Sequence, residues 1–213
     1  MSTKNPLFPV LFLAFVAVSA LCAGGESSAQ TNTLRQLPGD ALSNLDRAMN
    51  AHRVGDNMTA LESIWAAQEV IWNQSPLGVR NAVFVTESPV DYGAYRPKEG
   101  EDFKPSELII LYCEPFGYTQ RKNPDNTYSF SYTWSFQIFD AQNNFLGGQN
   151  DIGPIVYDGY RSFKTENMLA ATINVSNIPA GSYSLQITIK DDLNPAHSVD
   201  IRKPFNIVPE AEE

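Results

Sequence analysis

The segment YSFSYTWSFQI, residues 128–138, decides the fold of this 213-residue chain. Large apolar or aromatic side chains occupy every second position, and serine, threonine or glutamine fills the positions between them. Side chains of a β-strand point alternately to the two faces of its sheet, so this pattern predicts a strand with one buried and one polar face. We expect Trp134, on the apolar face, to be buried between two sheets.

Further strands are predicted on both sides of this segment. Asn-, Pro- or Gly-containing turns separate the runs, for example at 123–126 and 142–144. About seven short strands with such turns are typical of an antiparallel β-sandwich, so the predicted fold class is mainly β. The other apolar or alternating runs are residues 80–85, 107–114, 169–175, 182–189 and 199–208.

Two helices are predicted before the sandwich. Apolar residues at three- and four-residue spacing follow Pro38, Gly55 interrupts the pattern, and a second apolar stripe with Trp65 and Trp72 begins near Met58. This spacing predicts an αα-hairpin over about residues 40–74. A lone hairpin would expose its apolar stripe, so we expect it to pack against the sandwich and help shape an interaction surface.

The N-terminus has the pattern of a secretory signal peptide. A lysine precedes an apolar run over residues 7–23, and Ser27 and Ala29 form a small-x-small exit. We therefore predict cleavage after Ala29, a periplasmic or extracellular location, and no membrane span in the mature chain. Cleavage after Ala23, an uncleaved anchor, and a lipoprotein attached through Cys22 are the alternatives.

Two segments resemble known families. Residues 178–183, IPAGSY, resemble the tyrosine-corner entry to the sixth strand of immunoglobulin-like and fibronectin type III domains, which also keep a buried tryptophan where Trp134 falls. This part of the chain is therefore similar to a bacterial immunoglobulin-like domain, without the cysteine pair of antibody domains. Residues 55–60 with Ile64 and Ala67 resemble the inner half of a single tetratricopeptide repeat.

The predicted domain organisation follows from these segments. It consists of a signal peptide (1–29), a polar lead with the helical hairpin (30–78), an immunoglobulin-like β-sandwich (79–208) and an acidic tail (209–213).

Charge and composition exclude several function classes. The net charge is −9 and the basic residues form no cluster, so nucleic acid is an unfavourable partner. The chain has no glycine-rich phosphate loop, no nucleophile elbow, no metal-binding Cys or His spacing and only two histidines. We therefore expect no cofactor and no enzymatic activity. A Cys113–His197 dyad is disfavoured, because Cys113 lies in an apolar strand.

Aromatic residues in or beside the predicted loops are the candidate binding residues. Exposed rings often mark contact surfaces, where they can stack on sugars or seat a peptide. Alternatively, these rings cap the ends of the sandwich or receive the hairpin. The set consists of Tyr92, Tyr95, Phe103, Phe116, Tyr118, Tyr157 and Tyr160.

The acidic turn before the last strand contains the candidate metal ligands. Asp191 and Asp192, helped by Asp151 or Asp158, offer the carboxylate oxygens that calcium prefers. Aspartate is also an ordinary turn former, and no spaced calcium-loop motif is present, which favours a solvated turn.

The sequence favours a binding role over a catalytic one. We predict a non-enzymatic exported binding or assembly module of the bacterial cell envelope, with another envelope protein as its partner. The alternative is a carbohydrate-binding accessory domain that uses the loop aromatics to hold polysaccharide.

Overall fold

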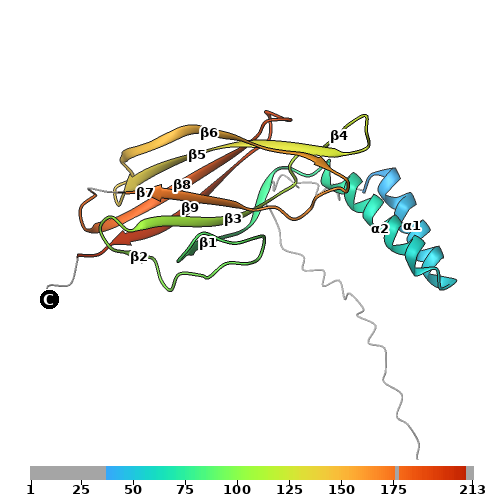
Figure 1. Ribbon diagram of the computed structural model, residues 1–213, viewed down its shortest axis with the longest axis horizontal. Helices are drawn as coiled ribbons and strands as arrows, with labels where there is room; N and C mark the ends of the chain where they lie inside the picture. Colours follow the sequence, from blue (N-terminus) through green and yellow to red (C-terminus); the bar gives the residue numbers. More distant parts are fainter. Residues whose placement is uncertain (1–36, 176–177, 210–213) are drawn as a thin grey trace, which may run out of the picture. The chain divides into compact units, whose positions relative to one another are not determined.

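The computed structural model describes residues 37–175 and 178–209 (Figure 1). The predicted signal peptide, Cys22 and residues 210–213 of the acidic tail lie outside these ranges. None of the helices in the described part of the chain is long and apolar enough to cross a membrane.

The first two elements form the predicted helical hairpin. Helix α1 spans Gly39–Arg53 and helix α2 spans Asn57–Trp72. Gly55 adopts a positive φ of 82° in the turn, and the side chain of Asp56 caps α2 by accepting a 3.1 Å hydrogen bond from the amide of Thr59. The buried positions of the hairpin are mostly small, so the helices can lie close together; they are Ala41, Ala48, Ala60, Ser63, Ala67 and the larger Trp72.

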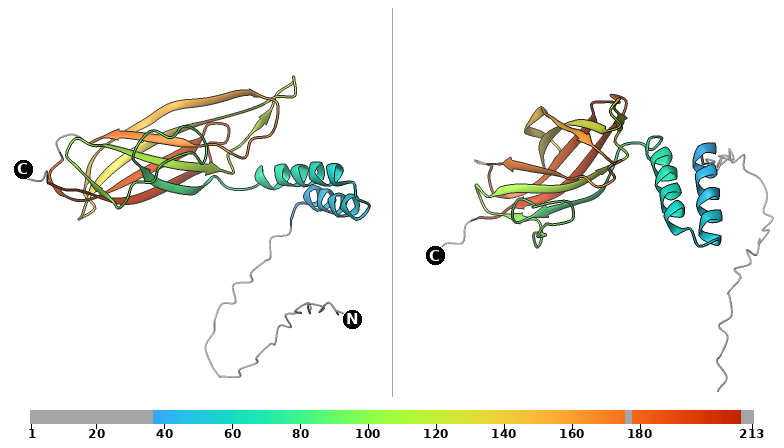
Figure 2. Two further views of the ribbon diagram at one scale, coloured as in Figure 1. Left: turned by 60° about the horizontal axis from the view of Figure 1, so that its bottom comes forward. Right: turned by 45° about the vertical axis from the view of Figure 1, so that its right-hand side comes forward.

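Two sheets form the sandwich, as two layers visible in Figure 2. The smaller sheet has the order β1-β3-β7, with β1 at Gly78–Val85, β3 at Leu108–Phe116 and β7 at Leu169–Asn174. The larger sheet has the order β2-β9-β8-β5-β4, and β6 also pairs with β5. Its strands are β2 Asp102–Phe103, β4 Arg121–Lys122, β5 Tyr128–Asp140, β6 Phe145–Tyr160, β8 Gly181–Asp191 and β9 Ser198–Ile207.

The described residues contain nine strands, where the sequence predicts about seven. Strands β2 and β4 have only two residues each, and a pairing that short leaves no periodic pattern in a sequence. Strand β6 is 16 residues long although it contains glycine, proline and aspartate, which are depleted in strands. Its pairing with β5, from Tyr128 opposite Tyr160 to Phe139 opposite Phe145, supplies the stabilisation that local propensity does not.

One hydrophobic core fills the space between the sheets. Leu111 and Ile173 contribute to it from the smaller sheet, and Tyr132, Ile187 and Phe205 from the larger one. Trp134 belongs to the same core with 7% of its surface exposed, which confirms its predicted burial.

The predicted polar face of β5 is partly covered. Ser129 and Ser135 are buried although they alternate with the core residues. The hydroxyl of Ser135 accepts a 3.0 Å hydrogen bond from the amide of Asp151 on β6, and that of Ser129 donates to the side-chain oxygen of Asn123 at 3.2 Å. Because neighbouring segments exclude water from these hydroxyls, the two protein partners supply the hydrogen bonds that water would otherwise make.

A tyrosine anchors the entry to β8. The hydroxyl of Tyr183 donates a 2.7 Å hydrogen bond to the main-chain carbonyl of Pro179, four residues upstream. The bond fixes the chain between Pro179 and Tyr183 where β8 begins.

The hairpin joins the sandwich at the end of α2. Trp72 is buried in the sandwich core, and its ring meets those of Tyr118 and Phe163 edge-on at centroid distances of 5.2 and 5.9 Å. Leu61 and Ile64, earlier on α2, are each 46% exposed. The predicted attachment of the hairpin to the sandwich is therefore confirmed at Trp72, and most of the apolar stripe is left uncovered, where it is open to another protein as the sequence-based prediction allowed.

Candidate functional site

A pocket of about 220 Å³ combines rings with polar side chains, and we call it the aromatic pocket. Strands β5 and β6 provide Phe130, Tyr157 and Tyr160, and the loop between β1 and β2 provides Asp91 and Tyr92. The segment that follows β6 completes the wall with Lys164, Glu166, Asn167 and Met168.

Strand pairing stacks three of the rings in this pocket. Phe130 on β5 stands opposite Tyr157 on β6, and their rings stack at 4.6 Å between centroids with 16° between planes. Tyr160 lies nearly parallel to Phe130, at 6.1 Å and 20°. Phe130 is buried, whereas the two tyrosines are half-buried. The ring of Tyr118 also packs on Phe130, at 4.5 Å between centroids, so the half-buried tyrosines are the rings that a ligand can reach.

Hydrogen bonds hold the segment that carries the polar wall. The main-chain carbonyl of Lys164 accepts bonds from the Tyr118 hydroxyl at 2.9 Å and the Gln120 side-chain amide at 2.6 Å. The amide of Lys164 donates to the Gln120 side-chain oxygen at 2.9 Å, and the buried Asn167 donates to the Tyr132 hydroxyl at 3.1 Å. The ammonium of Lys164 lies 5.0 Å from the centre of the Tyr160 ring, within cation–π range.

The Tyr92 side chain joins the pocket to a polar cluster on the smaller sheet. Burial raises the pKa of Tyr92, and the charge of Glu114 raises it further. The Tyr112 hydroxyl donates to Glu114 at 2.9 Å, and the ring of Tyr95 stacks on that of Tyr112 at 4.1 Å. The Tyr92 phenol thus lies close to the Glu114 carboxylate, which favours its protonated form.

The structure brings together three of the seven aromatic residues predicted from the sequence. Tyr92, Tyr157 and Tyr160 line the aromatic pocket. Phe103 and Tyr118 were predicted as ligand contacts, and this is wrong because both are buried in the core.

The remaining two predicted aromatics serve other contacts. Tyr95 stacks on Tyr112 and accepts a 2.7 Å hydrogen bond from Asn81. Phe116 is half-buried, with the guanidinium of Arg80 at 5.7 Å from its ring centre. Neither lines the aromatic pocket.

Sequence reasoning missed the rest of the pocket. Phe130 belongs to the alternating strand and carries only the signal of a core residue. Asp91, Lys164, Glu166 and Asn167 lie in loops, where no periodicity indicates which side chains will converge.

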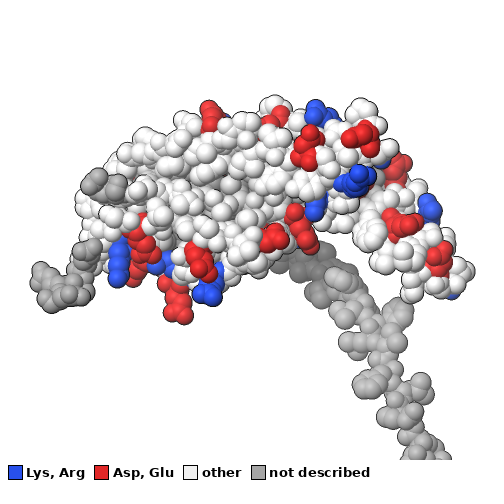
Figure 3. Space-filling model, viewed as in Figure 1, with Lys and Arg blue, Asp and Glu red and all other residues white. Residues whose placement is uncertain are grey.

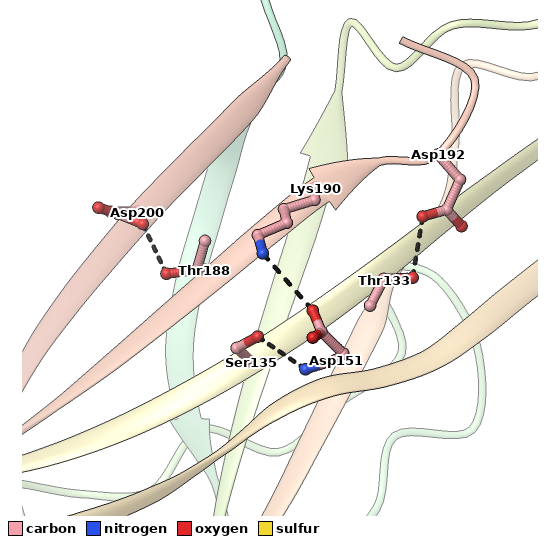
Figure 4. A network of polar contacts seen from close by, with 7 residues as sticks. All are labelled: Thr133, Ser135, Asp151, Thr188, Lys190, Asp192 and Asp200. Atoms are coloured by element: carbon pink, nitrogen blue, oxygen red, sulfur yellow. Dashed lines mark hydrogen bonds and ion pairs between the residues drawn. The ribbon is translucent and has the colours of Figure 1, made fainter. Parts of the chain in front are cut away.

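The predicted calcium ligands are occupied by hydrogen bonds and an ion pair. Figure 4 shows Asp192 accepting from the Thr133 hydroxyl at 2.8 Å and Asp151 beside the ammonium of Lys190 at 3.5 Å. Asp191 is buried and accepts from the amides of Thr119, Leu193 and Asn194. Among residues 37–175 and 178–209, no group of three or more acidic, cysteine or histidine side chains is arranged to hold a metal ion.

Asp158, the other predicted auxiliary calcium ligand, forms hydrogen bonds with nearby residues. Its carboxylate accepts hydrogen bonds from the Asn123 side chain at 3.3 Å and the Gly159 amide at 3.0 Å. These four aspartates therefore order strands and turns.

Cys113 is enclosed in the core. It stands between Ala82 of β1 and Leu169 of β7 in the smaller sheet, with no exposed surface. Burial raises the pKa of its thiol from an ordinary 9.0 to about 12. His197 lies in the loop between β8 and β9 of the larger sheet, so the two residues do not occupy a shared accessible site.

A second cleft of about 510 Å³, which we call the tryptophan cleft, is lined in part by residues next in sequence to those of the aromatic pocket. Tyr128 of β5 lines the tryptophan cleft, and Tyr160 of β6 lines the aromatic pocket. These two residues are paired directly in the β5–β6 register. Trp65 of α2 is 60% exposed there, and the Tyr128 hydroxyl donates to the Glu69 carboxylate at 3.3 Å. The full lining is Glu62, Trp65, Ala66, Gln68, Glu69, Tyr128, Arg161, Ser162, Phe163 and Thr165.

Charged side chains of both signs occur on one face of the molecule (Figure 3). Acidic and basic side chains are interspersed on the face shown in Figure 3, and no block of basic side chains lies on that face.

No protein-family model matches the chain, and no characterised protein matches its sequence significantly. Among solved structures, the C-terminal domain of wzt is 14% identical with a TM-score of 0.40, covering 66% of this chain and 77% of that one. CopC from Methylosinus trichosporium OB3b is 15% identical with a TM-score of 0.32, covering 62% of this chain and 99% of that one. Spo0M from Bacillus subtilis is 9% identical, also at 0.32, covering 65% and 51%. Similarity at this level assigns no ligand or function.

Proposed function

We propose that this protein is a non-enzymatic module that binds carbohydrate through the aromatic pocket. The observation that carries the proposal is the stack of Phe130, Tyr157 and Tyr160 beside four polar side chains. A pyranose ring has apolar C–H faces and a rim of hydroxyls. Ring faces suit the former, and carboxylate, amide and ammonium groups suit the latter.

The dimensions favour one unit of a longer chain as the occupant. The aromatic pocket, at about 220 Å³, is smaller than the usual sites for drug-sized ligands. The tryptophan cleft offers Trp65 as a further platform, with Glu62, Gln68 and Arg161 around it. We therefore propose a polysaccharide that places one sugar in the pocket and continues across the cleft.

The polar groups support binding over bond cleavage. Asp91 and Glu166 are both exposed, whereas a general acid of a glycosidase is tuned by burial or by a close carboxylate. Cys113 is enclosed and protonated at neutral pH. The pocket is thus suited to recognition.

We also propose that the module is exported and of immunoglobulin-like type. The signal-peptide pattern supports export. The Tyr183 bond to Pro179 and the facing of β1-β3-β7 by β9-β8-β5-β6 support the fold family.

Calorimetric titration with cellohexaose, laminarihexaose, chitohexaose and xylohexaose tests the proposed ligand class. We expect at least one to bind, and Tyr160→Ala to weaken that binding roughly tenfold or more, which corresponds to a loss of about 1.4 kcal/mol, because it removes one of the rings that line the pocket. Tyr160→Phe keeps the ring and should retain most of the affinity.

Val156→Ala is the matched control for this experiment. Val156 is on the same strand, 63% exposed and outside the pocket lining, so its replacement should leave affinity unchanged. Absence of binding to all four oligosaccharides and to insoluble polysaccharide columns, or an equal loss with the control, would contradict the proposal.

The hairpin favours a second candidate function, which is assembly with an envelope protein or with another copy of the chain. Its apolar side chains, including Leu42 and Met49, remain about half exposed. A hairpin variant that keeps oligosaccharide binding while losing assembly would separate the two functions.

A further inference from the structure

An apolar groove of about 640 Å³ runs between α1 and α2. A second hollow of about 360 Å³ shares Leu45 and Ile64 with it and continues to Trp72. We call the two together the hairpin groove. The larger part is lined by Leu42, Leu45, Asp46, Ala48, Met49, His52, Asn57, Ala60, Leu61 and Ile64.

The groove exposes more apolar surface than an isolated hairpin is expected to keep in water. Leu42, Met49, Leu61 and Ile64 are 46–52% exposed, and they lie together in one hollow. Contiguous apolar surface of this kind marks an interaction site, and helical pairs commonly bury it by stacking on another helical pair. The sandwich meets the hairpin through Trp72, which leaves this surface for another occupant.

We propose that a second copy of the chain covers the hairpin groove, so that two hairpins form a four-helix bundle. Polar groups within the groove are self-complementary and support this arrangement. Asp46 lies three residues before Met49 and His52 lies three residues after it, and all three line the groove. When two copies of α1 pack antiparallel about Met49, each Asp46 comes opposite His52 of the second copy.

The local geometry of His52 suits this pairing. Its Nδ1 lies 2.9 Å from the side-chain oxygen of Asn57, which orients the imidazole ring. Because Nδ1 is engaged by Asn57, Nε2 is the ring nitrogen that would meet a carboxylate of the second copy.

Symmetry distinguishes a second copy from an unrelated helix. A two-fold interface uses the same patch twice, so that residue i meets residue j and residue j meets residue i. The Asp46–His52 pair satisfies this condition twice, on either side of the Met49 contact. Helices of 15 and 16 residues also match in length, as a compact four-helix bundle requires.

Dimerisation would have a consequence for the proposed carbohydrate site. Two aromatic pockets in one particle can engage two positions on a single polysaccharide, which raises apparent affinity without new contacts. This consequence rests on the proposed function, whereas the dimer itself does not.

Sedimentation equilibrium of the purified protein tests the dimer. We expect a wild-type dimer, and Met49→Asp should raise its dissociation constant at least about a hundredfold because it places a charge in the apolar centre. Met58→Asp is the matched control. Met58 is also a helical methionine, 68% exposed, but lies outside the groove lining, so this variant should remain dimeric.

A charge exchange tests the predicted pairing. Asp46→Lys alone should weaken the dimer, and Asp46→Lys combined with His52→Glu should restore it, because a lysine and a glutamate of opposite charge then face each other. Both residues are exposed and both replacements favour helix, so this pair remains informative if Met49→Asp fails to fold. Far-UV circular dichroism verifies folding.

Three results would overturn the proposal. The first is a wild-type protein that stays monomeric at roughly 100 μM, which would leave the groove to a different protein. The second is a dimer that survives Met49→Asp or is equally disrupted by Met58→Asp. The third is a double variant that associates more weakly than Asp46→Lys alone. Each readout is independent of oligosaccharide binding.

Discussion

The indole Nε1 of Trp72 donates a 2.8 Å hydrogen bond to the main-chain carbonyl oxygen of Tyr118. Trp72 is the last residue of α2, and Tyr118 follows β3, so the bond links the hairpin to the sandwich. It satisfies the polar atom of a ring that is only 7% exposed. The end of α2 thereby enters the core without leaving a buried donor unpaired.

Replacing Trp72 should strongly destabilise the protein. Trp72→Ala removes a large core side chain and leaves the Tyr118 carbonyl without this donor, so we expect a loss of about 3–5 kcal/mol in the free energy of unfolding. Urea denaturation measures it. Trp65→Ala, on the same helix but 60% exposed, should change stability by no more than about 0.5 kcal/mol. Similar losses for the two variants would contradict this account.

Trp134 tests the packing between the sheets. It stands opposite Ile152 of β6 and Ile189 of β8, and its side chain belongs to the core. Trp134→Ala should lower the free energy of unfolding by about 3–5 kcal/mol, as measured by denaturant titration. The exposed Val156→Ala provides the baseline. A loss below about 1 kcal/mol for Trp134→Ala would mean that the core face is assigned wrongly.

Cys113 should be almost inert in the folded protein. Its thiol is fully buried, and its raised pKa leaves very little thiolate at neutral pH. Ellman's reagent should react slowly with the native chain and rapidly after denaturation in guanidinium chloride. Fast labelling of the folded protein, under conditions where circular dichroism shows no unfolding, would restore Cys113 as a candidate nucleophile.

Alkaline pH should lower stability. Burial raises the pKa of Cys113 to about 12 and also raises the pKa values of Tyr118 and Tyr132. These groups keep their protons in the folded state and lose them on unfolding. Their stabilising contribution is therefore complete below the ordinary thiol pKa of 9.0 and declines as pH rises towards about 12.

Denaturation midpoints measured between about pH 8 and pH 11 test this expectation. The midpoint should fall with increasing pH, and less steeply in Cys113→Ala than in the wild type. A midpoint that stays constant or rises over this interval would be inconsistent with the raised pKa values.

The mature protein should begin at Gln30. The apolar run over residues 7–23 and the small residues Ser27 and Ala29 meet the requirements of a signal peptidase. Intact mass spectrometry and N-terminal sequencing of exported protein check the cleavage site. An exported product that retains residues 7–23, or carries lipid on Cys22, would show that this reading of the N-terminus is wrong.

Periodic burial explains which elements could be predicted. The alternation over residues 128–138 predicted β5, and a similar pattern over residues 182–189 predicted most of β8. Apolar spacing of three and four residues predicted both helices. In each case the backbone geometry repeats at a fixed period. The pattern of apolar residues nearby therefore indicates whether a given side chain is buried or exposed.

Strand β6 could not be predicted from a periodic pattern. Residues such as Gly148 and Pro154 disfavour a strand locally, yet β6 pairs with β5 from Phe145 to Tyr160, with register shifts along the ladder. Gly148 approaches β5 so closely that a Cβ there would lie 2.2 Å from the carbonyl oxygen of Phe136. The glycine weakens the local signal and permits the tertiary contact.

The sequence by itself determined the two-sheet β class, the hairpin, the Tyr183 anchor and the burial of Trp134, because each depends on a repeating or short-range pattern. Only the tertiary structure decided that Tyr157 and Tyr160 line a pocket while Phe103 and Tyr118 enter the core. These rings lie in segments whose sequence has no regular period, so their exposure depends on which distant strands pack over them. The same holds for the hairpin groove, whose exposure follows from how little of α2 the sandwich covers.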